Sequence, residues 1–291
     1  MKKSLLLRKR LQKKEILVVP GVQAALFAKV VENAGFEAVY ATGAGIANLH
    51  LGIPDIGLAT MTEVLETVKR IVDATTLPVI ADIDDGYGNH LNVYRTVKEF
   101  TKAGVAALQL EDQKAPKRCG HFRGKNVVTR DEMVAKIKAA RDASVDDDLI
   151  LIARTDAIAP LSFEEALERA QAYGEAGADL LFVEAPENLE QLASIPGHLK
   201  FPVMANMVEG GKTPLLSSRV LEEMGYKIVV FANATLKSAI KGLQNLLNGL
   251  KNTGSTSELE NLMVSMEVRN ELTRLKEFQM LDGKYGRSDE K

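Results

Sequence analysis

Short runs of apolar, often β-branched residues alternate along the chain with longer amphipathic segments. Both faces of each run are apolar, which is typical of strands in a parallel sheet covered on both sides. The runs predict eight strands at residues 16–20, 38–42, 78–82, 105–111, 149–154, 180–184, 202–206 and 228–232. The segments between them predict helices, for example over residues 61–74, 92–103, 130–143 and 162–176. Several of these segments end in an Ala-Gly pair, a common helix stop.

Eight strand–helix units in this order favour an α/β fold, a (β/α)8 barrel of the TIM type. A doubly wound open sheet is the alternative. The chain has neither a Gly-x-Gly-x-x-Gly turn after its first strand nor a Walker loop. Residues 236–250 and 257–281 predict helices beyond those that a barrel needs. We therefore expect one domain over residues 1–291, in which residues 235–291 form a C-terminal helical extension with a role in oligomer contacts.

The first 14 residues carry seven lysines and arginines and no acid. A mitochondrial transit peptide is one interpretation, but Ser4 is the only hydroxyl residue in the segment. The apolar run Leu5–Leu7 is too short for the apolar core of a secretory signal. We therefore expect a basic first helix that leads into the fold at Ile16, and a cytoplasmic protein.

Composition narrows the class of protein. The 37 basic and 39 acidic residues give a formal net charge of −2, and the chain has no tryptophan and few aromatic residues. This argues against a dedicated nucleic-acid binder, which needs a basic surface and usually aromatic stacking platforms. The single cysteine excludes an intramolecular disulfide and a cysteine-rich zinc site. No run approaches the roughly 18 apolar residues of a membrane span. A small-molecule ligand remains the expected partner.

Polar residues stand at the carboxyl ends of six successive predicted strands, where barrel enzymes place their catalytic groups. These residues are Thr42, Asp82, Glu111, Arg154, Glu184 and Asn206. Asp82, Asp84 and Glu111 are hard oxygen donors, which predicts a divalent cation such as Mg²⁺. Strand alternation should turn Asp82 and Asp84 to the same side. Asp85 should point the other way, toward solvent. The competing interpretation is a set of solvated loop acids.

Two further residues predict chemistry at this end of the barrel. Arg154 ends an apolar run, so its guanidinium must either pair with a buried acid or bind a carboxylate or phosphate. Cys119 lies in a loop rich in lysine, arginine and histidine, and neighbouring cations lower a thiol pKa. It can therefore act as an acid–base group, although an inert cysteine is the simpler alternative. Gly120 and Gly124 would let this loop move as a lid.

The segment Lys117–His121, which reads Lys-Arg-Cys-Gly-His, resembles the loop motif of the isocitrate lyase and phosphoenolpyruvate mutase superfamily. The Asp82–Asp84 segment and the Ala153–Asp156 segment match the same superfamily. The resemblance covers about residues 15 to 275. The cysteine loop and the Thr-Asp pair after Arg154 resemble the carbon–carbon lyase branch, which includes methylisocitrate and dimethylmalate lyases. Carboxyphosphonoenolpyruvate mutase is similar to this branch as well.

The resemblance implies a barrel whose C-terminal helices are swapped between subunits, usually in a homotetramer. It implies Mg²⁺, with Mn²⁺ as a substitute, held by Asp82, Asp84 and Glu111 partly through water. It also implies a set of residues around the substrate. These are Thr42, Gly43 and Ala44 with Asp55 nearby, then Arg154, Glu184 and Asn206, and Cys119 and Gly120 on a gating loop.

The reaction implied by this branch is cleavage of a 2-hydroxy di- or tricarboxylate to pyruvate and succinate or propionate. Cys119 would protonate the carbanion, with His121 and Arg118 supporting the thiolate, and Arg154 would neutralise the enediolate charge. Oxaloacetate hydrolysis, a phosphonomutase reaction and a non-catalytic barrel are the alternatives.

The substrate itself stays open. Arg269 matches a distal arginine of methylisocitrate lyases, whereas Lys237 replaces another arginine. Phe231–Asn233 replaces their usual Tyr-Pro, and the roles of Asp85 and Asn233 are undecided.

Overall fold

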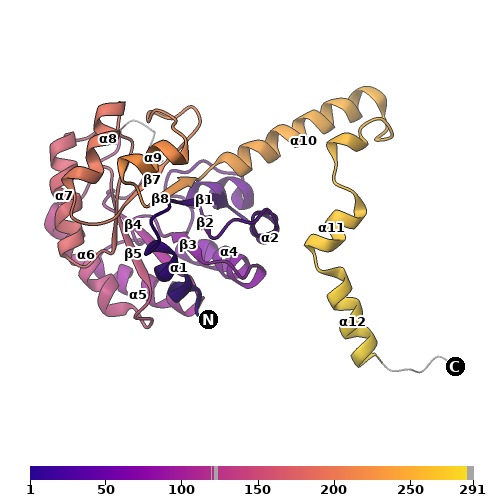
Figure 1. The fold of residues 1–291 in the computed structure, drawn as a ribbon, viewed down its shortest axis with the longest axis horizontal. Helices are drawn as coiled ribbons and strands as arrows, with labels where there is room; N and C mark the ends of the chain where they lie inside the picture. The colour runs from indigo at the N-terminus through magenta and orange to yellow at the C-terminus, as the bar shows by residue number, and fades with distance from the viewer. Residues whose placement is uncertain (119, 121–123, 287–291) are drawn as a thin grey trace. The chain divides into compact units, whose positions relative to one another are not determined.

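The computed structural model describes residues 1–118, 120 and 124–286. Eight parallel strands close into a barrel in chain order, and β1 pairs with both β2 and β8 (Figure 1). The strands are β1 (Leu17–Val22), β2 (Val39–Ala41), β3 (Val79–Asp82), β4 (Ala107–Glu111), β5 (Ile150–Thr155), β6 (Leu180–Val183), β7 (Val203–Asn206) and β8 (Ile228–Phe231). The predicted barrel and its eight strands are confirmed, and closure rules out the open sheet.

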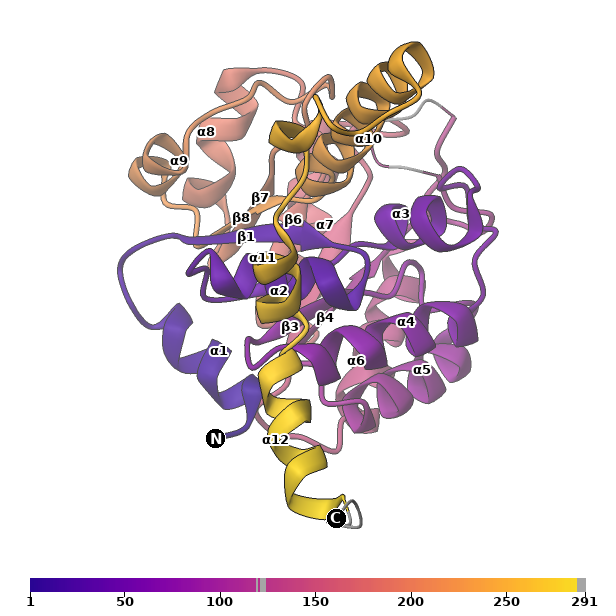
Figure 2. The same ribbon diagram turned by 90° about the vertical axis from the view of Figure 1, so that its right-hand side faces the viewer.

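Helices surround the barrel, and successive ones lie side by side, as α4, α5 and α6 do in Figure 2. They are α2 (Ala25–Asn33), α4 (Met61–Ala74), α5 (His90–Lys102), α6 (Arg130–Ala143), α7 (Phe163–Glu175), α8 (Leu189–His198) and α9 (Ser218–Met224). Their starting points follow from side-chain caps. Thr60 and Asn89 form capping boxes, and Thr129 and Ser162 each accept a backbone N–H of their helix. The four predicted helices are confirmed. Each begins where a polar cap precedes an amphipathic run.

The apolar core has two layers. Strand residues that point inward, such as Val19, Ile80 and Ile152, fill the barrel. Residues that point outward, such as Val79 and Leu151, pack against apolar helix faces. This two-sided burial explains why the strand sequences are apolar on both faces. The polar site is therefore confined to the strand ends.

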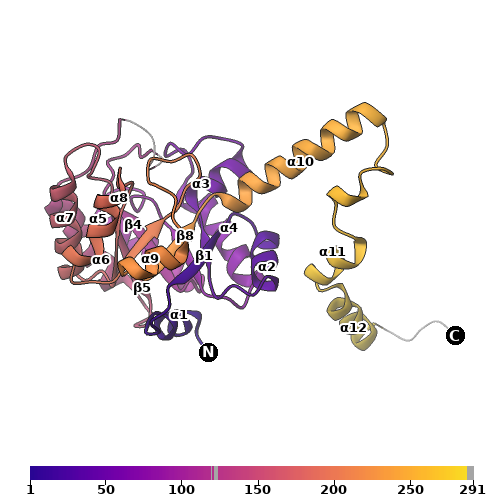
Figure 3. The same cartoon turned by 45° about the horizontal axis from the view of Figure 1, so that its top comes forward.

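The first helix, α1 (Lys3–Leu11), lies across the amino-terminal end of the barrel (Figure 3). Leu7 is fully buried in the core layer that fills the barrel. Arg8 donates through Nη2 to the Leu149 carbonyl at 3.0 Å, and its Nη1 lies 3.2 Å from the Asp179 carboxylate. The predicted basic helix is confirmed. It closes the barrel end opposite the strand ends that carry the polar residues.

The chain divides into two compact units, Met1–Leu236 and Lys237–Lys291. The second contains most of α10 (Ala234–Thr253), then η2 (Glu260–Leu262), α11 (Met266–Leu272) and α12 (Leu275–Tyr285). The helix predicted over residues 257–281 is broken because Ser265 caps α11 and Arg274 takes a left-handed conformation before α12. None of the described helices is long and apolar enough to cross a bilayer. The single-domain organisation and the helix swap stay predictions.

We expect Leu7→Ala to lower the free energy of unfolding by about 2–5 kcal/mol, because it leaves a cavity in a close-packed core. The matched control is Leu6→Ala at the neighbouring, 37% exposed position, where little change is expected. Chemical denaturation of both variants measures the difference. Equal losses at the two positions would show that α1 does not pack as described.

Candidate active site at the carboxyl ends of the strands

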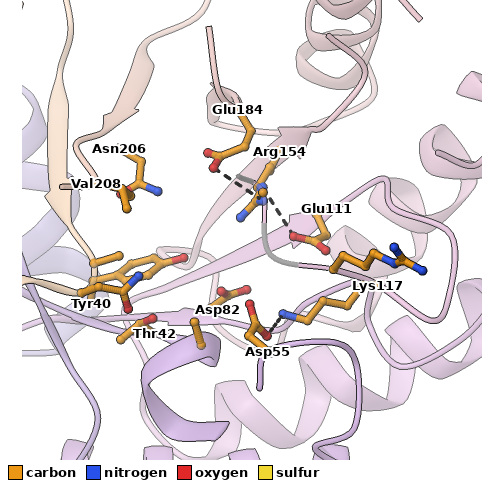
Figure 4. A pocket seen from close by; sticks show the side chains of 15 residues that line it. Tyr40, Thr42, Asp55, Asp82, Glu111, Lys117, Arg154, Glu184, Asn206 and Val208 are labelled. Carbon is orange, nitrogen blue, oxygen red and sulfur yellow. Dashed lines mark hydrogen bonds and ion pairs between the residues drawn. The ribbon is translucent and has the colours of Figure 1, made fainter. Parts of the chain in front are cut away.

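A polar pocket opens at the carboxyl ends of the barrel strands (Figure 4). Nine of the residues predicted for the site line it: Thr42, Ala44, Asp55, Asp82, Glu111, Gly120, Arg154, Glu184 and Asn206. Six further residues also line it: Tyr40, Lys117, Arg118, Val208, Ala232 and Asn233, of which Arg118 is expected from the sequence to support the thiolate. Gly43 and Asp84 lie directly beside the lining residues. The strand-end rule therefore gathers most of the predicted set in one place.

Asp82 and Asp84 converge on the backbone of Gly43. The Gly43 N–H donates to Asp82 Oδ2 at 3.4 Å, and a Cβ added to Gly43 would lie 3.1 Å from Asp84 Oδ1. Strand alternation is the wrong reason for this convergence, because β3 ends at Asp82. Asp84 instead adopts a left-handed conformation with φ of 49°, a region that aspartate enters more readily than most residues.

Asp85 does not point into solvent, so that expectation is wrong. Its side chain is buried, and its Oδ1 accepts a hydrogen bond from the Tyr87 N–H at 2.9 Å. Its backbone carbonyl accepts from the buried ammonium of Lys136, also at 2.9 Å. Asp85 therefore stabilises the turn after β3 and lies outside the pocket.

Lys117 is the main residue that the sequence reasoning missed. Its ammonium lies 2.7 Å from Asp84 Oδ1 and also bonds to Asp55. The side chain is buried, so this cation joins the loop after β2, the turn after β3 and the cysteine loop. The available signal is its place at the start of the Lys-Arg-Cys-Gly-His segment.

Arg154 pairs with a buried acid and also lines the pocket, where its other predicted role, binding of a carboxylate or phosphate, stays a prediction. Its Nε and Nη2 donate to Asp156 at 2.8 and 3.0 Å in a bidentate pair. Nε lies 3.4 Å from Glu111 Oε2, and Nη2 lies 3.8 Å from Glu184 Oε1. Figure 4 shows the guanidinium between those two glutamates. Three carboxylates thus surround one cation.

Burial controls the electrostatics of the acids. It raises the pKa of Asp84 to about 7, although the charge of Lys117 opposes the rise. It also raises the pKa of Glu111 well above its usual range, against the opposing charge of Arg154. Burial disfavours charged carboxylates unless a cation lies close by. The acids of this pocket would therefore gain from additional positive charge.

The donor set fits a hard divalent cation. Asp82, Asp84 and Glu111 offer only oxygen atoms, and Glu111 Oε1 is buried without a hydrogen-bond partner among the described residues. Within that same part of the chain, no three His, Cys, Asp or Glu side chains are grouped closely enough to hold an ion directly. Mg²⁺ usually keeps several waters and takes few protein ligands. Partial coordination through water is compatible with this arrangement.

Tyr40 and Gln109 connect the barrel interior to this acid set. The Tyr40 hydroxyl donates to Gln109 Oε1 at 2.8 Å, and Gln109 Nε2 lies 3.3 Å from Asp82 Oδ1. Both residues stand within apolar strand runs, so the strand-end rule did not select them. They nevertheless fix the orientation of one proposed metal ligand.

Several predicted residues are not placed at the pocket. Cys119 and His121 lie outside the described residues. Gly120 is described, and a Cβ added to it would lie 2.2 Å from Glu184 Oε1 and 2.5 Å from Arg154 Nη2. The backbone at Gly120 therefore lies against the site. Lys237 on α10 and Arg269 on α11 belong to the second unit, and their roles stay predictions.

A closed (β/α)8 barrel with a charged pocket at its strand ends is the architecture of a barrel enzyme. A family model described as phosphoenolpyruvate phosphomutase matches residues 7–251. The chain belongs to the phosphoenolpyruvate mutase/isocitrate lyase superfamily.

Relatives in this superfamily include named lyases. The chain is 46% identical to 2,3-dimethylmalate lyase of Eubacterium barkeri over 96% of each chain. It is 41% identical to 2-methylisocitrate lyase of Shewanella oneidensis, over 91% of this chain and 90% of that protein.

Solved structures also resemble this chain over almost its whole length. Oxaloacetate acetylhydrolase bound to 3,3-difluorooxalacetate superposes with a TM-score of 0.94 and 34% identity over 99% of each chain. Phosphonopyruvate hydrolase in complex with oxalate and Mg²⁺ has a TM-score of 0.88 and 28% identity over 99% of this chain and 100% of the other. The likeness thus extends across several reactions of the superfamily.

We expect Gly120→Ala to lower enzymatic turnover about a hundredfold, because its methyl group would displace Arg154 or Glu184 by roughly an ångström. Gly197→Ala on α8 is the matched control, since a Cβ there meets open space. Steady-state kinetics and thermal unfolding of both variants measure the effect. Wild-type turnover in Gly120→Ala would contradict the close approach described.

Proposed function

We propose that this protein is a Mg²⁺-dependent carbon–carbon lyase that cleaves a 2-hydroxy dicarboxylate of the 2,3-dimethylmalate type into pyruvate and propionate. The observation that carries the proposal is that a buried guanidinium, Arg154, and the oxygen donors Asp82 and Glu111 line the same pocket. Asp82 and Glu111 would hold a metal ion, and the metal ion and the guanidinium would each supply positive charge to a carboxylate of an anionic substrate. The 46% identity to 2,3-dimethylmalate lyase supports the same assignment.

The reaction breaks the C2–C3 bond of the substrate. The 2-hydroxyl transfers its proton to a carboxylate of the pocket lining and becomes the carbonyl of pyruvate. The bonding electrons move to C3, where the adjacent carboxylate delocalises them as an enediolate, and a proton delivered to C3 then yields propionate. When bound, Mg²⁺ supplies positive charge that lowers the pKa of the 2-hydroxyl.

The residues of the chain divide the remaining work. Arg154 stabilises the negative charge that develops on the leaving carboxylate, in a buried site where such stabilisation is strongest. Gln109 and Gly43 hold Asp82 in place by hydrogen bonds. We assign proton delivery to Cys119, and the position of its neighbour Gly120 against Arg154 and Glu184 supports that assignment.

The pocket wall favours a dicarboxylate over a tricarboxylate. The lining residues at the carboxyl ends of β7 and β8 are Asn206, Val208, Ala232 and Asn233, which include no cation. A third carboxylate on that side would find amides and small apolar side chains among the described pocket residues. A methyl substituent suits this wall better, because its burial is favourable at about 0.8 kcal/mol per carbon.

Assembly as a homotetramer through residues 237–286 is part of the same proposal. This second unit exposes many large apolar side chains, including Leu243, Leu247, Phe278 and Met280. Exposed apolar surface of this kind marks interaction sites. Multi-angle light scattering of the full chain measures the mass directly.

The experiment that tests the function is a substrate panel with the Mg²⁺-loaded protein. 2,3-Dimethylmalate, 2-methylisocitrate, isocitrate and oxaloacetate are supplied separately, and pyruvate, glyoxylate and oxalate are measured. We expect pyruvate from 2,3-dimethylmalate at the highest kcat/KM. Oxalate from oxaloacetate as the dominant product would instead identify a hydrolase, and a phosphonate seen by phosphorus NMR with a phosphorylated substrate would identify a mutase.

We expect Cys119→Ser to lower kcat by at least about a hundredfold, the effect of losing a general acid. Binding of oxalate, a planar dianion that resembles the enolate of pyruvate, should be kept because the binding groups remain. Stopped assays and calorimetric titration measure the two properties. A variant that turns over at the wild-type rate would remove Cys119 from the mechanism.

Removal of divalent metal should abolish turnover, because the acids of the pocket would lose the positive charge that burial demands. Mg²⁺ should restore it, and Mn²⁺ should substitute. Chelator already saturated with Mg²⁺ is the control for effects of the chelator itself. Full activity in protein whose metal content is verified as negligible would refute the metal requirement.

A further inference from the structure

Lys125 is a buried lysine that the proposed reaction does not use. Its ammonium lies 2.7 Å from Asp156 Oδ1 and donates to the Gly120 carbonyl at 2.5 Å. Only 1% of the side chain is exposed. Burying an ammonium is costly without an ionic partner, and the carboxylate it contacts belongs to the Arg154–Asp156 pair.

Asp156 therefore serves two cations at once. Arg154 occupies both of its oxygens in a bidentate pair, while Lys125 shares Oδ1. Burial alone would raise the pKa of Asp156, but the charges of Arg154 and Lys125 outweigh it and hold that pKa below its usual range. Asp156 is therefore ionised, and its negative charge balances the positive charge of one of its two cationic neighbours.

The backbone around Asp156 is held by a second buried acid. Asp112 accepts from the Asp156 N–H at 2.9 Å and from the Thr155 hydroxyl at 2.7 Å. It also accepts from the Tyr173 hydroxyl at 2.9 Å. Asp156 is thus fixed independently of Lys125, so removal of the lysine should change charge more than position.

The charge balance makes Lys125 consequential. Arg154 and Asp156 alone form a neutral pair, and such a pair attracts an anion only weakly. Lys125 adds one positive charge, so these three side chains together carry +1, which offsets negative charge on Glu111 and Glu184, the other acids beside Arg154. Because the site is largely buried, a change of one unit of charge there alters anion binding more than it would in water.

We propose that Lys125 is a positioning residue of the lyase reaction, which offsets the charge of Asp156 so that Arg154 presents positive charge to the anionic substrate. Lys125 also holds the Gly120 backbone where it lies against Arg154 and Glu184. The inference rests on the proposed lyase function for its kinetic readout. Oxalate binding provides a readout that does not depend on turnover.

The test uses Lys125→Met, which keeps the length of the side chain and removes its charge. We expect kcat to fall about a hundredfold, the loss typical when one group that stabilises developing charge is removed. Oxalate affinity in the presence of Mg²⁺ should fall at least about tenfold for the same electrostatic reason. Lys125→Arg keeps the charge and should recover most of both properties.

Lys3→Met is the matched control. Lys3 is a part-buried lysine at the opposite end of the barrel whose ammonium donates to the Val72 and Thr75 carbonyls at 2.6 and 2.7 Å. Its loss should lower the melting temperature while leaving kcat and oxalate affinity at wild-type values. A purely structural role for Lys125 would give this same pattern and would overturn the proposal.

The double variant Lys125→Met/Asp156→Asn separates charge from folding. It removes both members of the Lys125–Asp156 ion pair, so Lys125→Met is not judged on a fold weakened by an unpaired Asp156 carboxylate, and Glu111 and Glu184 remain beside Arg154. Positions 125, 154 and 156 together then carry the same net charge of +1 as in the wild-type protein. Oxalate affinity should therefore recover at least about tenfold over Lys125→Met. Affinity as weak as in Lys125→Met would refute the charge argument. A wild-type protein without lyase activity would refute the proposed function alone, because the oxalate comparison would still stand.

Discussion

The bidentate pair between Arg154 and Asp156 is the interaction on which the site depends. A guanidinium at the end of a buried strand must be compensated, and Asp156 supplies that compensation within two residues of the same chain segment. The parallel register then places Glu111 of β4 opposite Arg154 of β5. Each further acid near this cation requires positive charge of its own. Lys117, Lys125 and the proposed metal ion supply this positive charge.

The barrel fold accommodates this concentration of charge at one end of the sheet. Both sides of the sheet are apolar, so polar groups can collect only where the strands end. Asp112, buried beneath the site, ties β4 to the segment after β5 by accepting from Thr155 and from the backbone of Asp156. The framework that aligns the pocket is therefore made of fixed hydrogen bonds, which favours rapid stabilisation of developing charge without reorganisation. Membership of a superfamily with several lyases is consistent with such a preorganised anion site.

The barrel could be predicted from the sequence because buried strands and capped helices leave local signals. Thr60 and Thr129 mark their helix starts in the sequence itself. The contacts of Lys117 could not be predicted, because they join three loops that meet only in the folded chain. The left-handed turn at Asp84 and the helix break at Arg274 also escaped, since neither involves a glycine or a proline. Periodicity identifies elements, whereas the partners of buried charges depend on the tertiary fold.

The most direct test of the account is cleavage of 2,3-dimethylmalate in D₂O, followed by NMR of the products. A lyase that expels a carbanion and protonates it from an enclosed acid should yield pyruvate with an unlabelled methyl group. The propionate should carry one deuterium at C2 in a single configuration. Absence of propionate, or propionate labelled equally in both configurations, would contradict the proposed chemistry at this site.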